Sequence, residues 1–544
     1  MTERPLAAKK PFWSLGKLTL AWTLLALLAT VGTIGGIGIT VDEPLDVRPG
    51  RTYIATLFAR GSGFFRPEVV DMVFRDNAEH PPLGRWLLGI ASTLGEPIEM
   101  FLMGGPDPLR LYIHAARVAP AVCFALLVGL IVWTAGSHYG RAAASGSGFA
   151  MLAMPRLFAH AHLGALDTFL CLFWILGLLT TEFALRQSRN WLFMFLAGLA
   201  WGLALLTKIH AWFLAPILFL WWVLTARNRS GKVLLGWVAW GVGGFGVYLL
   251  GWPWLWHHSL ERLRAYAGTG VERTSIQVLY FGQVFADRDV PWHYPWFYFL
   301  VTVPVGLHLL GGIGVFAGRR DRFSWLLWGA ILFFLILFST RIPVYDGERL
   351  FLVVFPLWAV VIGLGFSKGW EWAGPHRVRR GLLSIFLVAQ GFGLVSTHPF
   401  GLSYYNLLVG GLPGAERLGL ELTYWNDAVD STLLDRLAKE ARPGDTAALA
   451  PTLYPTQGMA STTRLMARDG LVLGDEDKAL KARWVVVSRR TAYWKPALKK
   501  RLEAGKPILL RSRQGVWLSG LWDFGGSPRS SADSPSLSET RASP

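Results

Sequence analysis

Repeated stretches of about twenty apolar residues constrain this chain more than any other feature of its sequence. The first stretch runs from about Leu18 to Thr40, and similar stretches recur as far as residue 397. A helix of this length crosses the hydrocarbon layer of a bilayer, whereas a soluble core does not need so many of them. Hydrophobic residues make up 52% of the 544 residues. The sequence therefore predicts a polytopic α-helical membrane protein.

We expect about eleven transmembrane helices, with approximate boundaries. After the first, they cover residues 111–136, 142–156, 165–185, 191–207, 209–225, 233–252, 294–317, 323–340, 349–366 and 381–397. This divides the chain into a transmembrane domain (1–397) with large loops at 41–110 and 253–293, a carboxyl-terminal domain (398–524), and a tail (525–544) that we expect to be disordered because it is rich in Ser, Pro, Asp and Gly.

The distribution of Lys and Arg predicts the orientation in the membrane, because cytoplasmic loops are enriched in these residues. Alternate connections are basic, and the short connections on the opposite side supply only Arg156, Lys208, Arg341 and Arg349. The amino terminus is therefore expected in the cytoplasm, and both large loops and the carboxyl-terminal domain outside it, in a plasma membrane of the bacterial inner-membrane type. The basic connections contain Arg4, Lys9, Lys10 and Lys17; Arg141; Arg186 and Arg189; Arg227, Arg229 and Lys232; Arg319, Arg320 and Arg322; and Lys368, Arg377, Arg379 and Arg380.

Composition also limits the classes of ligand. The net charge of +17 comes largely from these short clusters between apolar stretches, so it indicates topology and not nucleic-acid binding. The two cysteines, Cys123 and Cys171, lie inside apolar stretches, which favours neither a disulfide framework nor a thiolate metal site. The sequence indicates no metal site, and it leaves a divalent cation open as a cofactor.

The carboxyl-terminal region has a different pattern from the rest of the chain. Strand-like stretches occur at Thr446 to Ala450 and Trp484 to Ser488, and a helical pattern occurs near 431–441. This mixture predicts a small extracytoplasmic α/β domain.

Ionisable residues at the ends of the expected spans mark a candidate site, because charge at a membrane boundary is costly. Each also has an ordinary structural interpretation: solvated acidic residues after a span, snorkelling cations, a helix cap, an ion pair at the interface, or a rigid His-Pro-Pro turn. All of them lie toward the same extracytoplasmic face in the predicted topology. They are Asp42 and Glu43 after the first span, His80 in the following loop, Arg117, Asp167, Lys208, Glu348 and Arg349.

Several motifs resemble the protein O-mannosyltransferases and their bacterial relatives, which are C-type (GT-C) membrane glycosyltransferases and are related to the aminoarabinose lipid A transferases. The resemblance covers the chain from the first span to about residue 430, and the order of the motifs is its most specific feature. The chain departs from the family pattern at "ELTYWNDAVD", which begins at Glu421. The matching motifs are Asp42-Glu43, "EHPPLGRWLLG" from Glu79, "RVAPAVCFALLVG" from Arg117, "ALDTFLCLF" from Ala165, "GLALLTKIHAWFL" from Gly202, "PWHYPWFYFLVTVP" from Pro291 and "LSYYNLLVGG" from Leu402.

The resemblance implies a GT-C fold and transfer of a sugar, such as mannose, from a polyprenyl-phosphate carrier to a protein, lipid or glycan acceptor, with inversion. It implies that Asp42 is the general base, a role worth about 10²–10⁴ in rate, and that Glu43 orients or tunes it. Arg117 then stabilises the departing phosphate, with Lys208 and Arg349 as further candidates. His80 and Arg85 help to place the phosphate or the loop. Asp167 holds a cation or a sugar hydroxyl, and Glu348 accompanies Arg349 in the same site.

Other functions also fit a polytopic membrane protein with basic loops. A multi-pass transporter is one alternative, but substrate and ion sites of transporters lie near the midplane, whereas these residues gather at one face. A polymerase or ligase of lipid-linked glycans would share the outward site.

Overall fold

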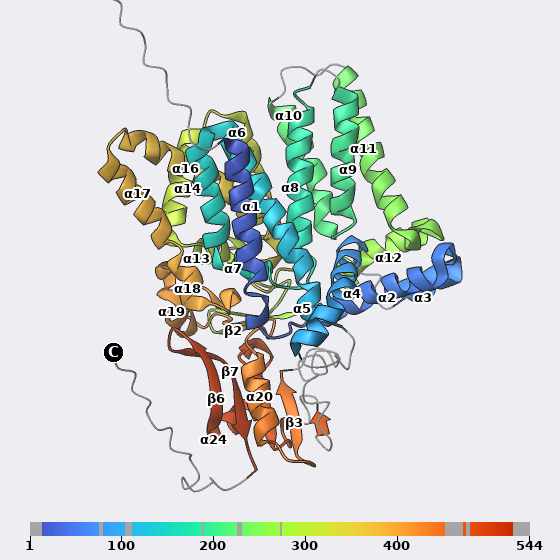
Figure 1. Cartoon of the computed structure of the whole chain (residues 1–544), viewed down its shortest axis with the longest axis vertical. Coiled ribbons are helices and arrows are strands. Elements are labelled where there is room, and N and C mark those ends of the chain that lie inside the picture. The colour runs from blue at the N-terminus through green and yellow to red at the C-terminus, as the bar shows by residue number, and fades with distance from the viewer. Residues whose placement is uncertain are drawn as a thin grey trace, which may run out of the picture.

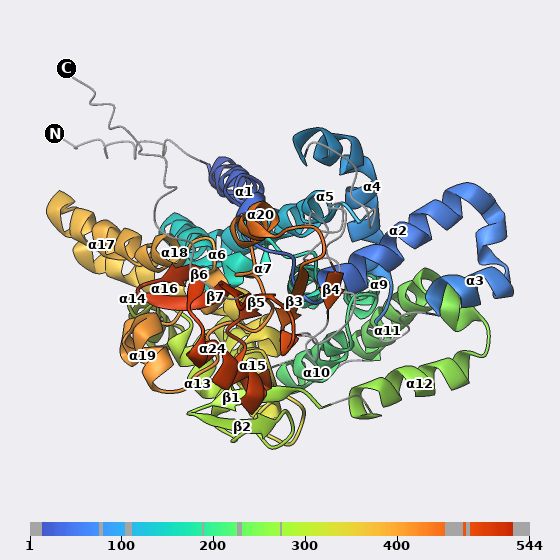
Figure 2. The ribbon, with the colours of Figure 1, turned by 90° about the horizontal axis from the view of Figure 1, so that it is seen from below.

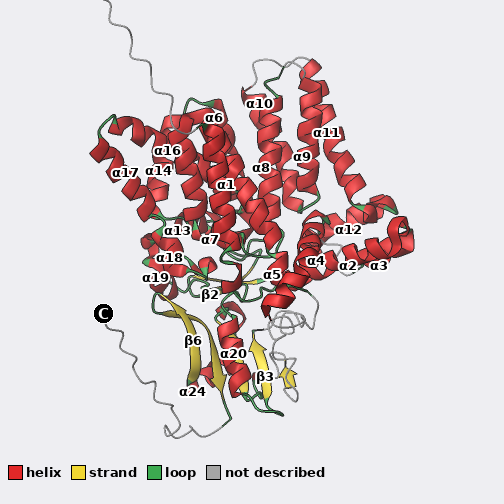
Figure 3. Cartoon of the chain, viewed as in Figure 1, coloured by secondary structure: helices red, strands yellow, loops and turns green. Residues whose placement is uncertain are grey.

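The computed structural model of the chain describes residues 14–75, 80–103, 111–187, 190–225, 231–272, 275–451, 472–474 and 479–525. Helices form most of these residues, and the larger of the two sheets lies beyond one end of the helical part (Figure 3). The expected disordered tail (525–544) lies outside the described residues except for Gly525.

A bundle of long helices forms the upper part of the molecule in Figure 1. At its centre is α16 (Val354–Ala373), which is buried from Val354 to Ser367 and packs against α6 (Val118–Ala153) and α14 (Val305–Gly318). The other long helices are α1 (Leu15–Val31), α8 (Asp167–Ala184), α9 (Asn190–Leu205), α10 (Leu214–Thr225), α11 (Gly231–Gly251), α15 (Arg322–Leu337) and α17 (Arg377–Ala389).

Further helices lie at the end of the bundle that faces the sheet. Among these, α2 (Glu43–Arg60), α3 (Pro67–Phe74) and α12 (Ser259–Glu272) run across the direction of the bundle, and α2 packs against α4 (Leu83–Met103) (Figures 1 and 2). The remaining short helices are α5 (Ile113–Ala116), α7 (Pro155–His160), α13 (Tyr294–Val301), α18 (Phe392–Thr397) and α19 (Gly411–Arg417), with 3₁₀ turns η1 (Ile34–Gly36), η2 (Gly61–Phe65), η3 (Ile209–Phe213), η4 (Pro253–Trp256), η5 (Arg349–Phe351), η6 (Gly401–Ser403), η7 (Leu407–Val409) and η8 (Thr491–Tyr493).

Five helical stretches among the described residues are long and apolar enough to cross a membrane, or six if the bent pair α13 and α14 forms one span. Shorter apolar helices lie at Trp191–Leu205, Ile209–Thr225 and Arg322–Leu337. The expected number of about eleven spans is therefore not confirmed. One reason is that the second and third expected spans fall on a single helical stretch, Ile113–Ala153, which changes direction at Gly140 (φ 86°). Another is the angle of 110° between α13 and α14, within what we expected to be one span.

The carboxyl-terminal region contains a five-stranded sheet in the order β4-β3-β5-β7-β6. Strand β3 pairs in parallel with β4 and β5, while β7 pairs antiparallel with β5 and β6. The tight turn between β6 and β7 has Gln514 and Gly515 at positive φ, a geometry that suits the right-handed twist of a hairpin. The strands are β3 (Thr446–Ala450), β4 (Val472–Gly474), β5 (Trp484–Ser488), β6 (Pro507–Arg513) and β7 (Val516–Asp523).

Helices cover both faces of this sheet. Because side chains alternate along its strands, each face presents its own set of apolar residues. On one face Ala447 and Val486 pack with Leu433 of α20 (Ser431–Glu440). On the other, Ala448 and Val485 pack in a core that includes α24 (Pro496–Ala504). The structure thus contains the expected helix and both expected strands of the carboxyl-terminal region. The separate hairpin of β1 (Gln277–Tyr280) and β2 (Gln283–Ala286) lies in the second large loop.

Candidate active site

Asp42 lies just before α2, at the junction with the segment that follows α1. This junction is held by a main-chain hydrogen bond from the Val41 N–H to the Trp425 carbonyl (3.3 Å). The Asp42 carboxylate accepts a hydrogen bond from Arg349 Nη2, and its side chain is 22% exposed. Asp42 is therefore a carboxylate that is held in place yet remains accessible, as a general base must be.

The Arg349 guanidinium contacts three carboxylates. Besides Asp42, it donates from Nε to Asp167 Oδ2 (3.3 Å) and from Nη1 to Asp346 Oδ2 (3.1 Å). The other oxygen of Asp167 accepts from Lys208 Nζ at 2.6 Å. We call these five residues, Asp42, Asp167, Lys208, Asp346 and Arg349, the Arg349 cluster. The sequence predicted four of its members, and the structure brings them together.

The cluster joins segments that are far apart in the chain. Asp42 precedes α2, Asp167 is the first residue of α8, and Lys208 lies between α9 and η3. The Trp425 ring lies 4.1 Å from the Arg349 guanidinium carbon and covers its flat face. The cluster therefore depends on tertiary packing of several elements at the end of the bundle, where α2, α5 and α7 face the sheet (Figure 1).

A tight turn places Asp346 and Arg349 in this cluster. Asp346 and Gly347 both have positive φ, 55° and 65°, the left-handed region that favours glycine. A Cβ atom at position 347 would lie only 2.8 Å from Arg156 Nη1 and 3.2 Å from the Tyr298 ring. Gly347 is therefore required for this turn, which directs Asp346 and Arg349 toward each other.

Glu43 and Arg117 form a separate, fully buried pair. Arg117 Nε and Nη2 donate to the two carboxylate oxygens of Glu43 at 2.6 and 2.8 Å, and neither side chain is exposed. The main-chain N–H groups of Thr40 and Gly164 donate to the same carboxylate, each at 2.8 Å. Burial raises the pKa of Glu43, but the Arg117 charge and these hydrogen bonds outweigh it, so the pKa falls below its ordinary value.

The remaining donors of Arg117 are also used. Its Nη1 donates to the carbonyl oxygens of Ile34 (3.1 Å) and Ile37 (3.3 Å), and its Nη2 donates to Gly38 (2.6 Å). These contacts fix the segment between α1 and Asp42. In this arrangement Arg117 holds the protein chain and presents no spare N–H to a phosphate.

Arg85 and His80 lie next to this region. Arg85 Nε donates to Asp46 Oδ1 (3.0 Å), and Arg85 Nη1 donates to the His80 carbonyl (3.3 Å). Burial and the positive charges of Arg85, Lys208 and Arg349 hold the pKa of His80 well below its usual value. His80 is thus a neutral imidazole near the Arg349 cluster. Burial raises the pKa of Asp46 to about 6 despite its pairing with Arg85.

Glu348 points into a second buried group instead of the Arg349 cluster. Its Oε2 accepts from Arg156 Nη1 at 2.8 Å, and its Oε1 lies 3.8 Å from His160 Nε2. The Arg156 guanidinium lies over the Tyr405 ring at 4.5 Å. The structure therefore separates Glu348 from Arg349, although the two residues are adjacent in the sequence.

Sequence reasoning missed several residues of this region. Asp346 and Arg490 form an ion pair of 3.0 Å next to Arg349, although they are far apart in the chain. Arg156 was identified only as a basic residue between two spans. The segment from Glu421 that departs from the family pattern supplies Trp425, whose ring packs against Arg349, so this departure was itself a signal.

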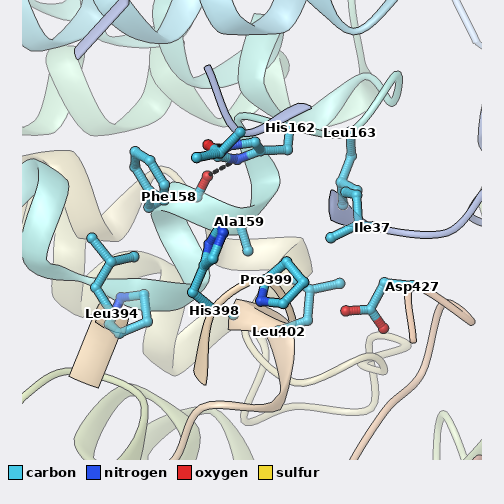
Figure 4. A pocket seen from close by; sticks show the side chains of 13 residues that line it. Ile37, Phe158, Ala159, His162, Leu163, Leu394, His398, Pro399, Leu402 and Asp427 are labelled. Carbon is cyan, nitrogen blue, oxygen red and sulfur yellow. Dashed lines mark hydrogen bonds between the residues drawn. The ribbon is translucent and has the colours of Figure 1, made fainter. Parts of the chain in front are cut away.

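The structure also has a pocket whose lining includes no member of the Arg349 cluster (Figure 4). It is lined by His162, His398 and Asp427 among apolar side chains, and none of the residues predicted as site residues lines it. The ring nitrogens of His162 are hydrogen-bonded to the Phe158 carbonyl (2.8 Å) and to Thr33 Oγ1 (2.7 Å). Among the described residues, no group of three or more His, Cys, Asp or Glu side chains is arranged to hold a metal ion.

Comparison with known proteins gives a partial family match and a fold. Residues 110–257 match the model of the dolichyl-phosphate-mannose-protein mannosyltransferase family. No curated protein sequence matches the chain significantly. Among solved structures, ArnT from Cupriavidus metallidurans in the apo state aligns with a TM-score of 0.50 and 17% identity, over 93% of this chain and 97% of ArnT.

Two further structures align over most of this chain with lower scores. ArnT from the same organism bound to undecaprenyl phosphate has a TM-score of 0.48 and 17% identity, over 93% of this chain and 97% of ArnT. The oligosaccharyltransferase AglB from Archaeoglobus fulgidus, in complex with an inhibitory peptide and a dolichol-phosphate, has 0.44 and 12%, over 96% of this chain and 74% of AglB. The family match over residues 110–257 agrees with the resemblance found in the sequence, and the likeness to ArnT shows a shared fold.

Proposed function

We propose that the protein transfers a sugar from a polyprenyl-phosphate carrier to an acceptor hydroxyl, or a similar nucleophile, at the extracytoplasmic membrane face. One observation carries this proposal: the partly exposed Asp42 carboxylate lies in one cluster with two cations, Lys208 and Arg349. Transfer of this kind needs a group that removes the acceptor proton and cations that stabilise the departing phosphate.

Asp42 is the proposed general base. In a single displacement, the acceptor hydroxyl attacks the anomeric carbon while its proton passes to Asp42, and the bond from that carbon to the phosphate oxygen breaks. Attack from the face opposite the phosphate inverts the anomeric configuration. In the resting arrangement Arg349 Nη2 binds Asp42. A donor phosphate at Arg349 competes for that guanidinium, so donor binding and release of the base are linked.

Arg349 and Lys208 are the proposed phosphate-binding cations. Both side chains are mostly buried, with exposed fractions of 10% and 6%. A partly dry site strengthens their attraction for the negative charge that develops on the leaving phosphate. Asp167, which contacts both cations, holds them on the same side of the proposed phosphate site. His80, held neutral beside them, is suited to hydrogen bonding with the donor.

We propose a positioning role for Glu43 and Arg117 instead of contact with substrate. Support comes from their complete burial and from the use of the Arg117 donors by Glu43 and three main-chain carbonyls. The pair fixes the chain directly before Asp42. Arg85 has a similar role through Asp46, at the point where α2 and α4 meet.

Membrane orientation and domain roles are also part of the proposal. The amino terminus lies in the cytoplasm, and the Arg349 cluster and residues 398–524 lie outside it, which the alternation of basic connections supports. Mannose is the proposed sugar because of the family match. The acceptor is a protein, lipid or glycan hydroxyl.

The proposal is tested by incubating the purified protein with tritium-labelled polyprenyl-phosphate mannose, glucose or aminoarabinose, with native membrane extract as the acceptor source. We expect consumption of one donor and labelling of an acceptor, with loss of both in Asp42→Asn. The matched control is Asp71→Asn, because Asp71 is half exposed and pairs with Arg262, outside the Arg349 cluster. Flux of a labelled donor across sealed vesicles without any transfer would contradict the proposal and favour a transporter. Consumption of none of the three donors would also contradict the proposal.

A further inference from the structure

Arg490 reaches from the carboxyl-terminal sheet toward the Arg349 cluster. It follows β5 and is 3% exposed. Its Nη2 donates to Asp346 Oδ1 at 3.0 Å, and its Nη1 donates to the Tyr424 carbonyl. A buried guanidinium that is part of one region but pairs with a carboxylate of another links the two regions directly.

The loop that carries Arg490 is attached to the helical part at neighbouring points. The N–H groups of Thr491 and Ala492 donate to the Glu421 carboxylate at 2.9 and 3.2 Å. The Gln277 N–H of β1 donates to the Tyr493 hydroxyl at 2.9 Å. These contacts leave the Arg490 side chain little freedom to turn away from Asp346.

Asp346 is shared between two guanidinium groups. Its Oδ1 accepts from Arg490, and its Oδ2 accepts from Arg349. Arg349 already serves Asp42 and Asp167, so it has three carboxylates to satisfy. Removing one partner of a buried charge pair leaves an uncompensated charge.

The charge balance shows what Arg490 contributes. Without it, Asp42, Asp167 and Asp346 face only Lys208 and Arg349, so one negative charge is left over. Asp167 contacts both cations, whereas Asp42 and Asp346 then share Arg349 alone. Of these two, Asp346 is the more buried, with a side chain that is 5% exposed against 22% for Asp42. The Arg349 fork is then drawn toward Asp346 and away from Asp42, because attraction is strongest where water is least available.

We propose that Arg490 is a positioning residue of the active site: the carboxyl-terminal sheet supplies the cation that satisfies Asp346 and thereby keeps Arg349 directed at Asp42 and the donor phosphate. This inference rests on the proposed function. It gives residues 398–524 a role in the reaction, because the helical part alone lacks one charge of the site.

The test compares Arg490→Met with Arg489→Met in the full-length protein. Arg489 is the neighbouring residue, and it pairs with Glu416 at 2.5 Å and lies over Trp517, without contacting Asp346. With the polyprenyl-phosphate sugar that the wild-type protein consumes, we expect kcat of Arg490→Met to fall at least tenfold while KM for the donor changes less than threefold. Arg489→Met is expected to stay within twofold of the wild-type protein in both constants.

A second-site variant separates positioning from loss of folding. Asp346→Asn removes the excess negative charge, so the double variant Arg490→Met with Asp346→Asn is expected to recover at least threefold in kcat over Arg490→Met. Arg490→Lys, which keeps the charge, is expected to lie between the wild-type protein and Arg490→Met. A merely structural role of Arg490 predicts loss of activity in step with melting temperature and no recovery in the double variant.

The inference is overturned if Arg490→Met and Arg489→Met have equal kcat, or if the double variant is no faster than Arg490→Met. These results leave the proposed function intact as long as Asp42→Asn remains inactive. Full activity of Asp42→Asn would instead remove the proposed function, whatever Arg490→Met does.

Discussion

The adjacent carboxylates Asp42 and Glu43 occupy two different environments. Glu43 is fully buried, and it is satisfied by Arg117 and two main-chain N–H groups. Asp42 is partly exposed and contacts Arg349, which other carboxylates share. A charged pair at the end of a membrane span can thus divide two tasks: one residue holds the chain in place, and the other remains available for chemistry.

The largest expected effect comes from breaking the buried ion pair between Glu43 and Arg117. Glu43→Gln leaves the Arg117 charge buried without its counter-ion, so we expect a loss of about 3–5 kcal/mol in the free energy of unfolding. Thermal or denaturant unfolding in detergent measures it. Glu371→Gln is the control, because Glu371 forms an exposed pair with Lys368. Equal stability of the two variants would contradict the structural role of Glu43.

Changes around the accessible Asp42 are expected to lower the transfer rate and not the stability. Arg349→Lys keeps the charge but loses the fork that reaches Asp42, Asp167 and Asp346 together. We expect kcat to fall about a hundredfold, which corresponds to about 2.7 kcal/mol. Initial rates with labelled donor measure this effect, with Arg319→Lys as a distant control. A wild-type kcat in Arg349→Lys would show that the fork geometry does not matter.

A smaller effect is expected at Lys208. Lys208→Met removes one of the two proposed phosphate-binding cations, but Arg349 still neutralises Asp167. We expect kcat/KM for the donor to fall about tenfold, or about 1.4 kcal/mol. The exposed Lys368→Met is the matched control, and it should retain the wild-type value. Equal values for both variants would remove Lys208 from the site.

The smallest expected effect concerns the contact between the two regions. Burial raises the pKa of Glu421 to about 7, although Arg490 and the N–H groups of Ala492 and Thr491 lower it. The folded protein therefore favours the neutral form of Glu421. The stability that this neutral form contributes is lost as the pH rises through about 7. We expect a melting temperature about 1–3 °C lower at pH 8 than at pH 6 from this group.

Glu421→Gln tests that assignment, since glutamine cannot titrate. The part of the pH dependence that belongs to Glu421 should disappear in this variant and persist in Glu416→Gln, whose parent carboxylate pairs with Arg489. An unchanged difference between pH 6 and pH 8 in Glu421→Gln would show that other groups cause it.

Much of the fold could be predicted from the sequence because apolar stretches and alternation are local signals. The helix Ser431–Glu440 and the strands Thr446–Ala450 and Trp484–Ser488 were expected within a residue of their bounds. The angle of 110° between α13 and α14 was not expected. It depends on packing between helices, which hydropathy along one segment does not contain.

The site could be predicted only in part, for a similar reason. Asp42, Asp167, Lys208 and Arg349 were found because charge at the end of a span is unusual. Asp346 and Arg490 lie in polar segments, where a charge is ordinary, and their pairing spans 144 residues. Position in the sequence also did not show that the donors of Arg117 are satisfied by the protein itself.

The proposed reaction depends on Asp42 to remove the acceptor proton and on Glu43 to support the fold. The most direct measurement is the initial transfer rate of Asp42→Asn per folded molecule, determined together with its melting temperature. We expect a rate at least a hundredfold below the wild-type rate, at an unchanged melting temperature. A rate equal to that of the wild-type protein, or a loss fully explained by a smaller folded fraction, would contradict the proposed role of Asp42.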